Sequence, residues 1–251
     1  MSARRLRMLL LLGCLLASSA RAAEPELTKL SIPVRGKPVS ALLQRPADAR
    51  ALLVLAHGQV MDIHHPFMEA MSDALAKHRI ATLRFNFPYA EDKRAQLDAQ
   101  PLLVEALVAA VNEGEKRRGS LPLLVGGKSV GALIAVEAVR QGVVPGSQGL
   151  VILSFPLHAP QRPSALNAPL VSSLTTPVLF VQGTRDPLAD VALMTAVVER
   201  IGKRASIHVV DDADHLFALP ADSTRTQAQV YDEIAGAVED FVATLAQSQG
   251  G

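Results

Sequence analysis

Short apolar runs alternate with longer amphipathic stretches along most of the chain. Six runs are apolar almost throughout, as is typical of strands buried on both faces of a parallel sheet. They cover residues 51–56, 80–85, 121–125, 150–154, 178–182 and 206–210. Helical spacing marks five further stretches, at residues 65–77, 102–115, 130–140, 188–201 and 226–246. This alternation predicts a mostly parallel sheet covered by helices.

Two strands of another kind come first. Residues 27–34 and 38–44 alternate between apolar and polar positions, and Arg35, Gly36 and Lys37 between them suit a hairpin turn. An antiparallel start followed by helical crossovers predicts an α/β-hydrolase fold, with about eight strands, helices on both faces and no cap domain. A dinucleotide-binding sheet would need G-x-G-x-x-G after an early strand, and the sequence lacks it.

The first 22 residues have the three-part layout of a secretory signal peptide. An arginine-rich start precedes an apolar run at residues 8–17, and Ala-Arg-Ala at 20–22 provides an A-x-A cleavage site. The run is shorter than the roughly 20 residues that a bilayer span needs. We therefore expect a signal peptide over residues 1–22, one α/β-hydrolase domain over 23–251, and a periplasmic or secreted protein. A buried N-terminal helix, twin-arginine export and lipoprotein anchoring at Cys14 stay open as alternatives.

Removal of such a leader changes the charge balance. The leader holds four of the 25 basic residues and no acidic one, which leaves 21 Lys and Arg against 24 Asp and Glu. A mildly acidic domain gives no support for nucleic-acid binding. Cys14 is the only cysteine, so the exported domain is expected to fold without disulfides. We expect no membrane span after signal removal, and the oligomeric state stays open.

The stretch LLVGGKSVGALIA at residues 123–135 carries the most specific chemistry. Its Gly-Lys-Ser matches the end of a phosphate-binding loop, but Pro122 stands where that motif needs its first glycine. The alternative is a G-x-S-x-G nucleophile elbow, in which a strand leads into Ser129 and a helix leads out. A serine that only caps the helix is the competing structural interpretation.

An activated serine needs a base and an acid, which follow it in this order in the predicted fold. Asp186 comes just after the strand at 178–182, and His215 comes after the strand at 206–210. Both positions fall at the carboxyl edge of the sheet, where open α/β sheets build their sites. Asp186 could instead cap the next helix, and His215 could be a structural loop residue. Asp190, the rival acid, falls inside the predicted helix.

The remaining site residues are predicted to lie at the same carboxyl edge of the sheet. The backbone N–H groups of Val130 and Gln59 are expected to bind the oxyanion, while His57 is expected to brace the Gln59 loop. Candidate substrate-binding residues are Val60, Tyr89, His158 and Phe217. No metal site or cofactor is expected, because His64 and His65 are adjacent rather than four residues apart on a helix.

Several of these segments together resemble a known group. They are AHGQVMDIHHPFM, TLRFNFPYA, VGGKSVGALIA, FPLHAP, FVQGTRDPLAD and DADHLF, and they extend from about residue 52 to 217. The chain resembles the α/β-hydrolases of the testis-expressed-protein-thirty and NSL-complex-subunit type, and is more distantly similar to dienelactone hydrolases. The resemblance implies a cap-less serine hydrolase with Ser129, Asp186 and His215 as its triad.

Two departures limit what the resemblance implies. Gln59, Val60 and Ala132 stand where the family commonly has glycines, and Ser129 stands where dienelactone hydrolases use a cysteine. The expected activity is hydrolysis of a small-molecule carboxylic ester through an acyl-enzyme. A peptidase or amidase using the same triad, and a non-catalytic binding module, are the alternatives.

Overall fold

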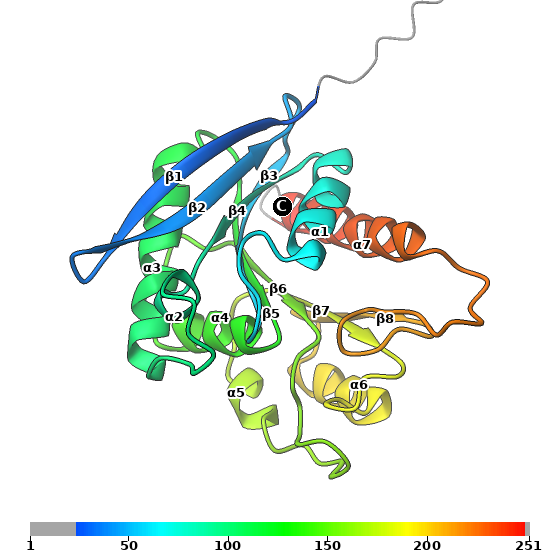
Figure 1. Ribbon diagram of the computed structural model, residues 1–251. Coiled ribbons are helices and arrows are strands. Elements are labelled where there is room, and N and C mark those ends of the chain that lie inside the picture. The colour runs from blue at the N-terminus through cyan, green and yellow to red at the C-terminus, as the bar shows by residue number, and fades with distance from the viewer. Residues whose placement is uncertain (1–23, 249–251) are drawn as a thin grey trace, which may run out of the picture.

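The computed structural model describes residues 24–248, so the predicted signal peptide lies outside the described residues. One eight-stranded sheet runs through the molecule in the order β1-β2-β4-β3-β5-β6-β7-β8 (Figure 1). The strands are β1 (Glu26–Val34), β2 (Lys37–Arg45), β3 (Ala51–Ala56), β4 (Ile80–Phe85), β5 (Leu123–Lys128), β6 (Gly149–Leu153), β7 (Val178–Gly183) and β8 (Ala205–Val210).

The sheet begins antiparallel and continues parallel. β2 is antiparallel to both β1 and β4, and every other neighbouring pair is parallel. The hairpin between β1 and β2 turns through Arg35 and Gly36, whose φ angles are 48° and 79°. Two consecutive positive φ angles are the mark of a type I′ turn, whose twist matches that of the flanking strands. The predicted α/β-hydrolase fold is confirmed.

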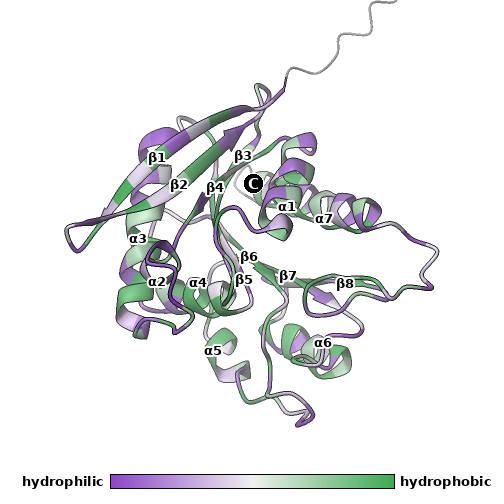
Figure 2. Cartoon of the chain, viewed as in Figure 1, coloured by the Kyte–Doolittle hydropathy of each residue, from purple (hydrophilic) through white to green (hydrophobic). Residues whose placement is uncertain are grey.

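Helices cover both faces of the sheet (Figure 1). They are α1 (Pro66–Lys77), α2 (Pro88–Glu91), α3 (Gln100–Arg117), α4 (Val130–Arg140), α5 (Ala168–Ser172), α6 (Val191–Ile201) and α7 (Gln227–Ser248). Apolar side chains of α1 and α7 form a core on one face, and those of α3, α4, α5 and α6 form a core on the other. Apolar colour accordingly concentrates on the central strands in Figure 2.

Differences between predicted and observed elements lie at their ends. β5 extends to Lys128, three residues beyond the expected end, and α6 begins at Val191 rather than at Leu188. The side chain of Asp190 accepts a hydrogen bond from Leu193 N–H and so caps α6 from outside, which corrects its predicted place within the helix. The short helices α2 and α5 were not expected, and between residues 24 and 248 no separate cap domain is present.

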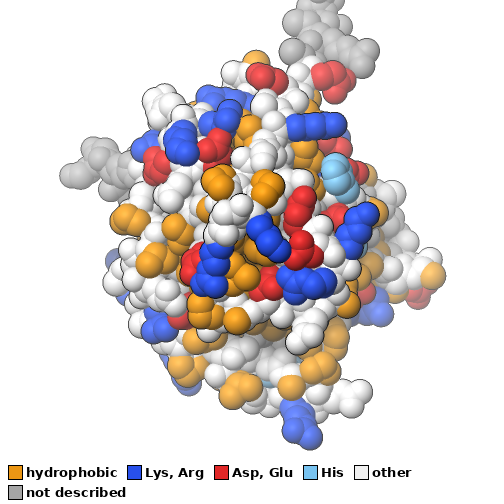
Figure 3. All heavy atoms as spheres, turned by 60° about the vertical axis from the view of Figure 1, so that its left-hand side comes forward, with side chains coloured by type: hydrophobic (Ala, Val, Ile, Leu, Met, Phe, Trp, Pro, Cys, Tyr) orange, Lys and Arg blue, Asp and Glu red, His pale blue; other side chains and the backbone are white. Residues whose placement is uncertain are grey.

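The hydrophobicity of the helices and the charge of the surface bear on membrane and nucleic-acid partners. No helix within the described residues is long and apolar enough to cross a membrane. On the face in Figure 3, which shows part of the described surface, basic and acidic side chains lie interspersed rather than in separate areas.

Candidate active site

Ser129 lies at the sharp turn between β5 and α4. Its backbone has φ 56° and ψ −115°, a strained conformation for a residue other than glycine. Its N–H donates to the Leu153 carbonyl of β6 at 3.0 Å, which fixes the turn against the sheet. The hydroxyl makes no capping hydrogen bond to α4. The side chain is therefore available for another partner, as a nucleophile elbow requires.

Two glycines permit the close approach that forms this turn. A Cβ on Gly127 would lie 2.3 Å from the Gly131 carbonyl carbon, and one on Gly131 would lie 2.6 Å from the Ala56 and His57 oxygens. Both contacts are with backbone, which cannot move aside as a flexible side chain could. The first turn of α4 therefore packs directly against the end of β3.

Three loops bring Ser129, Asp186 and His215 together. His215 Nε2 lies 2.8 Å from Ser129 Oγ, and His215 Nδ1 lies 2.8 Å from Asp186 Oδ2. An ionised carboxylate can only accept, so Nδ1 carries the proton and Nε2 is free to accept from the serine hydroxyl. This arrangement can take a proton from Ser129 and hold the imidazolium that forms.

Asp186 is buried and held by further donors. Oδ2 accepts from Gln182 Nε2 at 2.5 Å, and Oδ1 accepts from Leu188 N–H at 2.8 Å. These bonds orient the carboxylate toward His215. Asp190, the rival acid, instead caps α6. The helix-capping alternative for Asp186 therefore does not describe its contacts.

The loop after β3 lies beside the serine. A Cβ on Gly58 would be 3.5 Å from Ser129 Cβ. The Gly58 carbonyl accepts from the Tyr89 hydroxyl at 3.1 Å and lies 2.8 Å from His57 Nδ1, which donates to it. Because N–H and C=O point in opposite directions across a trans peptide, these bonds turn the Gln59 N–H away from Tyr89. Among the described residues, no hydrogen-bond partner occupies that N–H.

His57 and Tyr89 hold this loop through buried polar contacts. His57 Nε2 accepts from Phe87 N–H at 3.1 Å, so both ring nitrogens are bonded to backbone. Burial lowers the pKa of His57 to about 4, and it therefore stays neutral. Burial likewise raises the pKa of Tyr89 to about 12, which keeps its hydroxyl protonated as a donor. These contacts agree with the bracing role expected for His57.

The four predicted substrate-binding residues separate into two pairs. Val60 and Tyr89 line a depression of about 350 Å³ beside the Gln59 loop. Val60 is 79% exposed and has φ 57°, which is strained for a β-branched side chain. His158 and Phe217 are buried, as Tyr89 also is, but they belong to other loops. His158 donates to the Ala159 carbonyl and accepts from Asp190 N–H, each at 2.9 Å.

Those contacts favour packing or bracing roles for the second pair. Both ring nitrogens of His158 are already bonded to backbone, so it ties the loop after β6 to the start of α6. Phe217 is 0% exposed, and its ring stacks on Phe67 of α1 with centroids 6.0 Å apart. Both side chains are therefore held by contacts within the protein.

Sequence reasoning missed two residues at the site. Gln182, the donor to Asp186, ends the apolar run of β7, where a single amide gives little signal. Lys128 directly precedes Ser129; its side chain is 0% exposed and its Nζ donates to the His215 carbonyl. The signal that was available is its place at the end of a strand buried on both faces.

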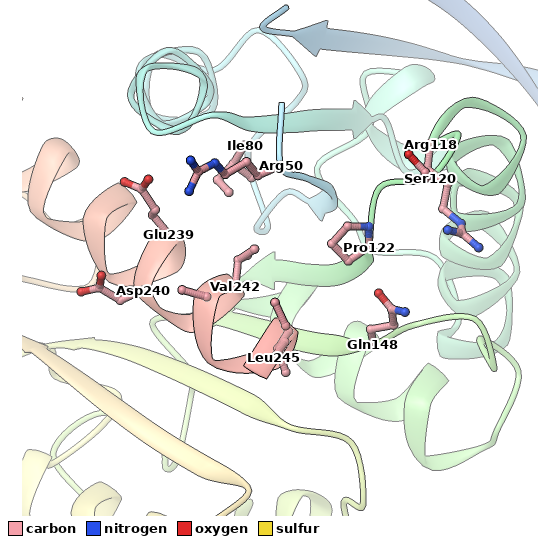
Figure 4. A pocket seen from close by; sticks show the side chains of 12 residues that line it. Arg50, Ile80, Arg118, Ser120, Pro122, Gln148, Glu239, Asp240, Val242 and Leu245 are labelled. Atoms are coloured by element: carbon pink, nitrogen blue, oxygen red, sulfur yellow. The ribbon is translucent and has the colours of Figure 1, made fainter. Parts of the chain in front are cut away.

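A cavity of about 510 Å³ lies at the opposite edge of the sheet (Figure 4). It is lined there by Arg50, Pro122 and Gln148, which directly precede β3, β5 and β6, and by residues of α7. No histidine lines it. The serine, histidine and aspartate therefore mark a different place from the cavity. Between residues 24 and 248 no group of three or more His, Cys, Asp or Glu side chains is arranged to hold a metal ion.

The comparisons with known proteins agree with this architecture. The protein-family model described as alpha/beta hydrolase domain matches residues 49–243. The chain therefore belongs to that family and is a hydrolase by fold and family. A dienelactone hydrolase from Anabaena variabilis ATCC 29413 is 18% identical, with a TM-score of 0.69, over 88% of this chain and 99% of its own.

Two further solved structures are similar. Est1E from Butyrivibrio proteoclasticus is 16% identical, with a TM-score of 0.66, over 87% of this chain and 99% of its own. XC6422 from Xanthomonas campestris, described as an α/β serine hydrolase without lid, is 18% identical, with a TM-score of 0.63, over 87% of this chain and 95% of its own. At these identities the likeness shows the fold.

Proposed function

We propose that this protein is an exported serine hydrolase that cleaves small-molecule carboxylic esters through an acyl-enzyme. The observation that carries the proposal is the continuous chain of 2.8 Å contacts from Ser129 Oγ through the His215 ring to Asp186. A hydroxyl in a strained turn, bonded to a histidine that a buried carboxylate orients, is the arrangement of an activated nucleophile.

The reaction proceeds in two halves. Ser129 Oγ attacks the ester carbonyl carbon while His215 Nε2 takes its proton, and Asp186 stabilises the imidazolium. The N–H groups of Val130 and Gln59 bind the oxyanion; Val130 opens α4, where the first N–H groups have no partner within the helix. The C–O bond to the alcohol then breaks, and the alcohol leaves with the proton from His215. Water attacks the acyl-enzyme by the same route and releases the acid.

Small or exposed esters are the substrate class that the shape favours. Between residues 24 and 248 no cap covers the carboxyl edge of the sheet. The depression next to the Gln59 loop has a volume of about 350 Å³ and is lined by Val60 and Tyr89 together with polar side chains such as Asp62 and Lys93, which suits a small group better than a long apolar one. The serine hydrolase without lid among the similar structures supports this choice.

Export is the second part of the proposal and rests on the sequence of residues 1–22. The arginine-rich start, the apolar run and the A-x-A site are its basis. N-terminal sequencing of the protein expressed in a Gram-negative host, after separation of periplasm and cytoplasm, tests it. A periplasmic protein beginning at Ala23 is expected, and a cytoplasmic protein that retains Met1 would contradict it.

Labelling by a fluorophosphonate probe tests the chemistry. We expect the wild-type protein to be labelled, and Ser129→Ala and His215→Ala to lose at least about 10³-fold in labelling rate. Ser154→Ala is the matched control, because Ser154 is a buried serine that follows the neighbouring strand β6 and its hydroxyl has no hydrogen-bond partner. Its labelling should equal that of the wild type.

The contrary outcome would point to the competing functions. A folded wild-type protein that is not labelled would show that the serine is not activated and would favour a binding module. Turnover of p-nitrophenyl acetate but not of the matching p-nitroanilide supports an esterase. Faster cleavage of the anilide would identify an amidase instead.

A further inference from the structure

Lys128 occupies an unusual position for a lysine. It ends β5 directly before Ser129, and its side chain is 0% exposed. Because side chains alternate along a strand, Lys128 shares a face of the sheet with Leu124, which belongs to the core beneath α1 and α7. The lysine side chain therefore lies inside the apolar layer that supports the site.

The ammonium group is enclosed by one oxygen and two aromatic rings. Nζ donates to the His215 carbonyl and lies 5.8 Å from the ring centroid of Phe67 and 5.5 Å from that of Phe217. A cation near two aromatic faces is attracted by both rings. Lys128 thus joins the main chain of the His215 loop to α1.

The charged groups that act on Lys128 belong to the site. Asp186 follows β7 and Asp214, the neighbour of His215, follows β8, while α1 contributes the Phe67 ring. Burial lowers the pKa of Lys128 to about 7, against the opposing effect of the two carboxylates. Below that pH the group next to the triad is an ammonium ion.

We propose that Lys128 is a positioning residue for the base of the reaction. Its Nζ fixes the main chain of His215 by donating to the carbonyl in either protonation state, and its positive charge at low pH opposes protonation of the imidazole, which keeps the base free there. This inference rests on the proposed function, since it concerns the same serine, histidine and aspartate.

A purely structural role is the competing explanation, and the same loop supplies a comparison. Gln227, the first residue of α7, donates from Nε2 to the Phe217 carbonyl at 2.8 Å. It supports the loop two residues beyond His215 with a neutral amide. A support that needs no charge can therefore hold this loop, and the charge of Lys128 is what distinguishes the two residues.

The experiment measures the rate constant for fluorophosphonate labelling of the purified protein from pH 5 to pH 9. The variants are Lys128→Met, which keeps the length and removes the charge, and Gln227→Met as the matched control. The acid limb of such a profile reports protonation of the base. Circular dichroism and thermal unfolding establish that both variants are folded.

Lys128→Met is expected to lower the plateau rate by about ten- to a hundredfold, because small misplacements of a reacting group are costly. Its acid limb should move to higher pH by about half a unit or more, because the removed cation no longer opposes protonation. Gln227→Met should leave the limb in place. Thermal stability of Lys128→Met should not fall in proportion to its rate.

The outcomes separate this inference from the proposed function. A reactive wild-type protein together with a Lys128→Met acid limb that matches wild type overturns the inference and leaves the function intact. The inference is also overturned, with the function intact, if the labelling rate of Lys128→Met falls only in proportion to its thermal stability and its acid limb does not move. A wild-type protein that is unreactive at every pH overturns the proposed function, and the inference with it.

Discussion

Ser129 and Lys128 are neighbours in the chain but lie in opposite environments. The serine hydroxyl meets His215 at the edge of the sheet, while the lysine side chain lies in the apolar layer behind it. Both contact the same histidine, one at its ring and one at its carbonyl. The position of His215 is thus determined from two directions by consecutive residues.

Gln182 offers a test of how far the carboxylate depends on its donors. Gln182→Met removes the 2.5 Å bond to Asp186 Oδ2 and leaves the Leu188 N–H bond to Oδ1. Hydrogen bonds to charged groups contribute about 1.5–3 kcal/mol, so kcat/KM for p-nitrophenyl acetate should fall at least about tenfold. KM should change little, since no substrate contact is removed.

Gln141→Met is the matched control for that measurement. Gln141 also donates from Nε2 to a carboxylate, that of Glu137 at 2.6 Å, but at the far end of α4. Its kcat/KM should equal that of the wild type. Equal losses in the two variants would mean that the Gln182 bond has no special part in orienting Asp186.

At the scale of single residues, the sequence indicates the members of the candidate site more readily than the residues that support them. Ser129, Asp186 and His215 could be found because their chemistry needs a fixed order at strand ends. Gln182 and Lys128 could not, because their roles depend on which buried face each side chain takes. The same limit explains His158 and Phe217, which were expected at the pocket and are buried.

At the scale of helices and strands, the close contact between α4 and β3 determines the shape of the turn at Ser129. The first turn of α4 approaches the β3 backbone so closely that only glycine fits at residue 131. Strand order alone predicts that β3 and β5 are adjacent, but it does not give this distance. The start of α6 shows the same limit, since Asp190 ends the loop by capping rather than by continuing the helix.

Two helical glycines should respond to alanine in opposite directions. Gly131→Ala places a Cβ 2.6 Å from the Ala56 and His57 oxygens and should destabilise the fold by about 3 kcal/mol or more. Gly236→Ala places one 3.5 Å from His78 Cε1, an ordinary contact, and should stabilise α7 by about 0.5–1 kcal/mol. Urea unfolding measures both, and equal effects would contradict the packing described.

At the scale of the whole molecule, the burial of Lys128 makes the free energy of unfolding depend on pH. Its pKa is lowered to about 7 by burial, so between about pH 7 and pH 10 the folded state binds fewer protons than the unfolded state. Stability from this group therefore rises with pH across that range and is least below pH 7. Lys128→Met lacks this dependence.

The difference in free energy of unfolding between Lys128→Met and the wild type isolates the contribution of Lys128 from those of the other titrating groups. The free energy of unfolding of Lys128→Met, relative to wild type, should be most favourable below pH 7 and decline by on the order of 4 kcal/mol toward pH 10. Urea unfolding at four pH values measures it. A difference that is constant with pH would mean that Lys128 titrates normally in the folded protein.

The sequence was most informative about the fold as a whole. Eight strands and their antiparallel start were predicted, because apolar runs and helical spacing report directly on burial. The short helices α2 and α5 were not, since four or five residues are too few to show a helical period. Both lie in loops whose shape depends on the elements around them.

The order of Ser129, Asp186 and His215 along the chain has a consequence for biogenesis under the proposed function. Ser129 is synthesised first, and His215 arrives only with the loop after β8, the last strand of the sheet. A serine hydroxyl without its base is a poor nucleophile. Under the proposed function, a nascent chain, or one truncated before β8, therefore carries a dormant serine, and reactivity begins only when about the last fifth of the protein has folded onto the rest.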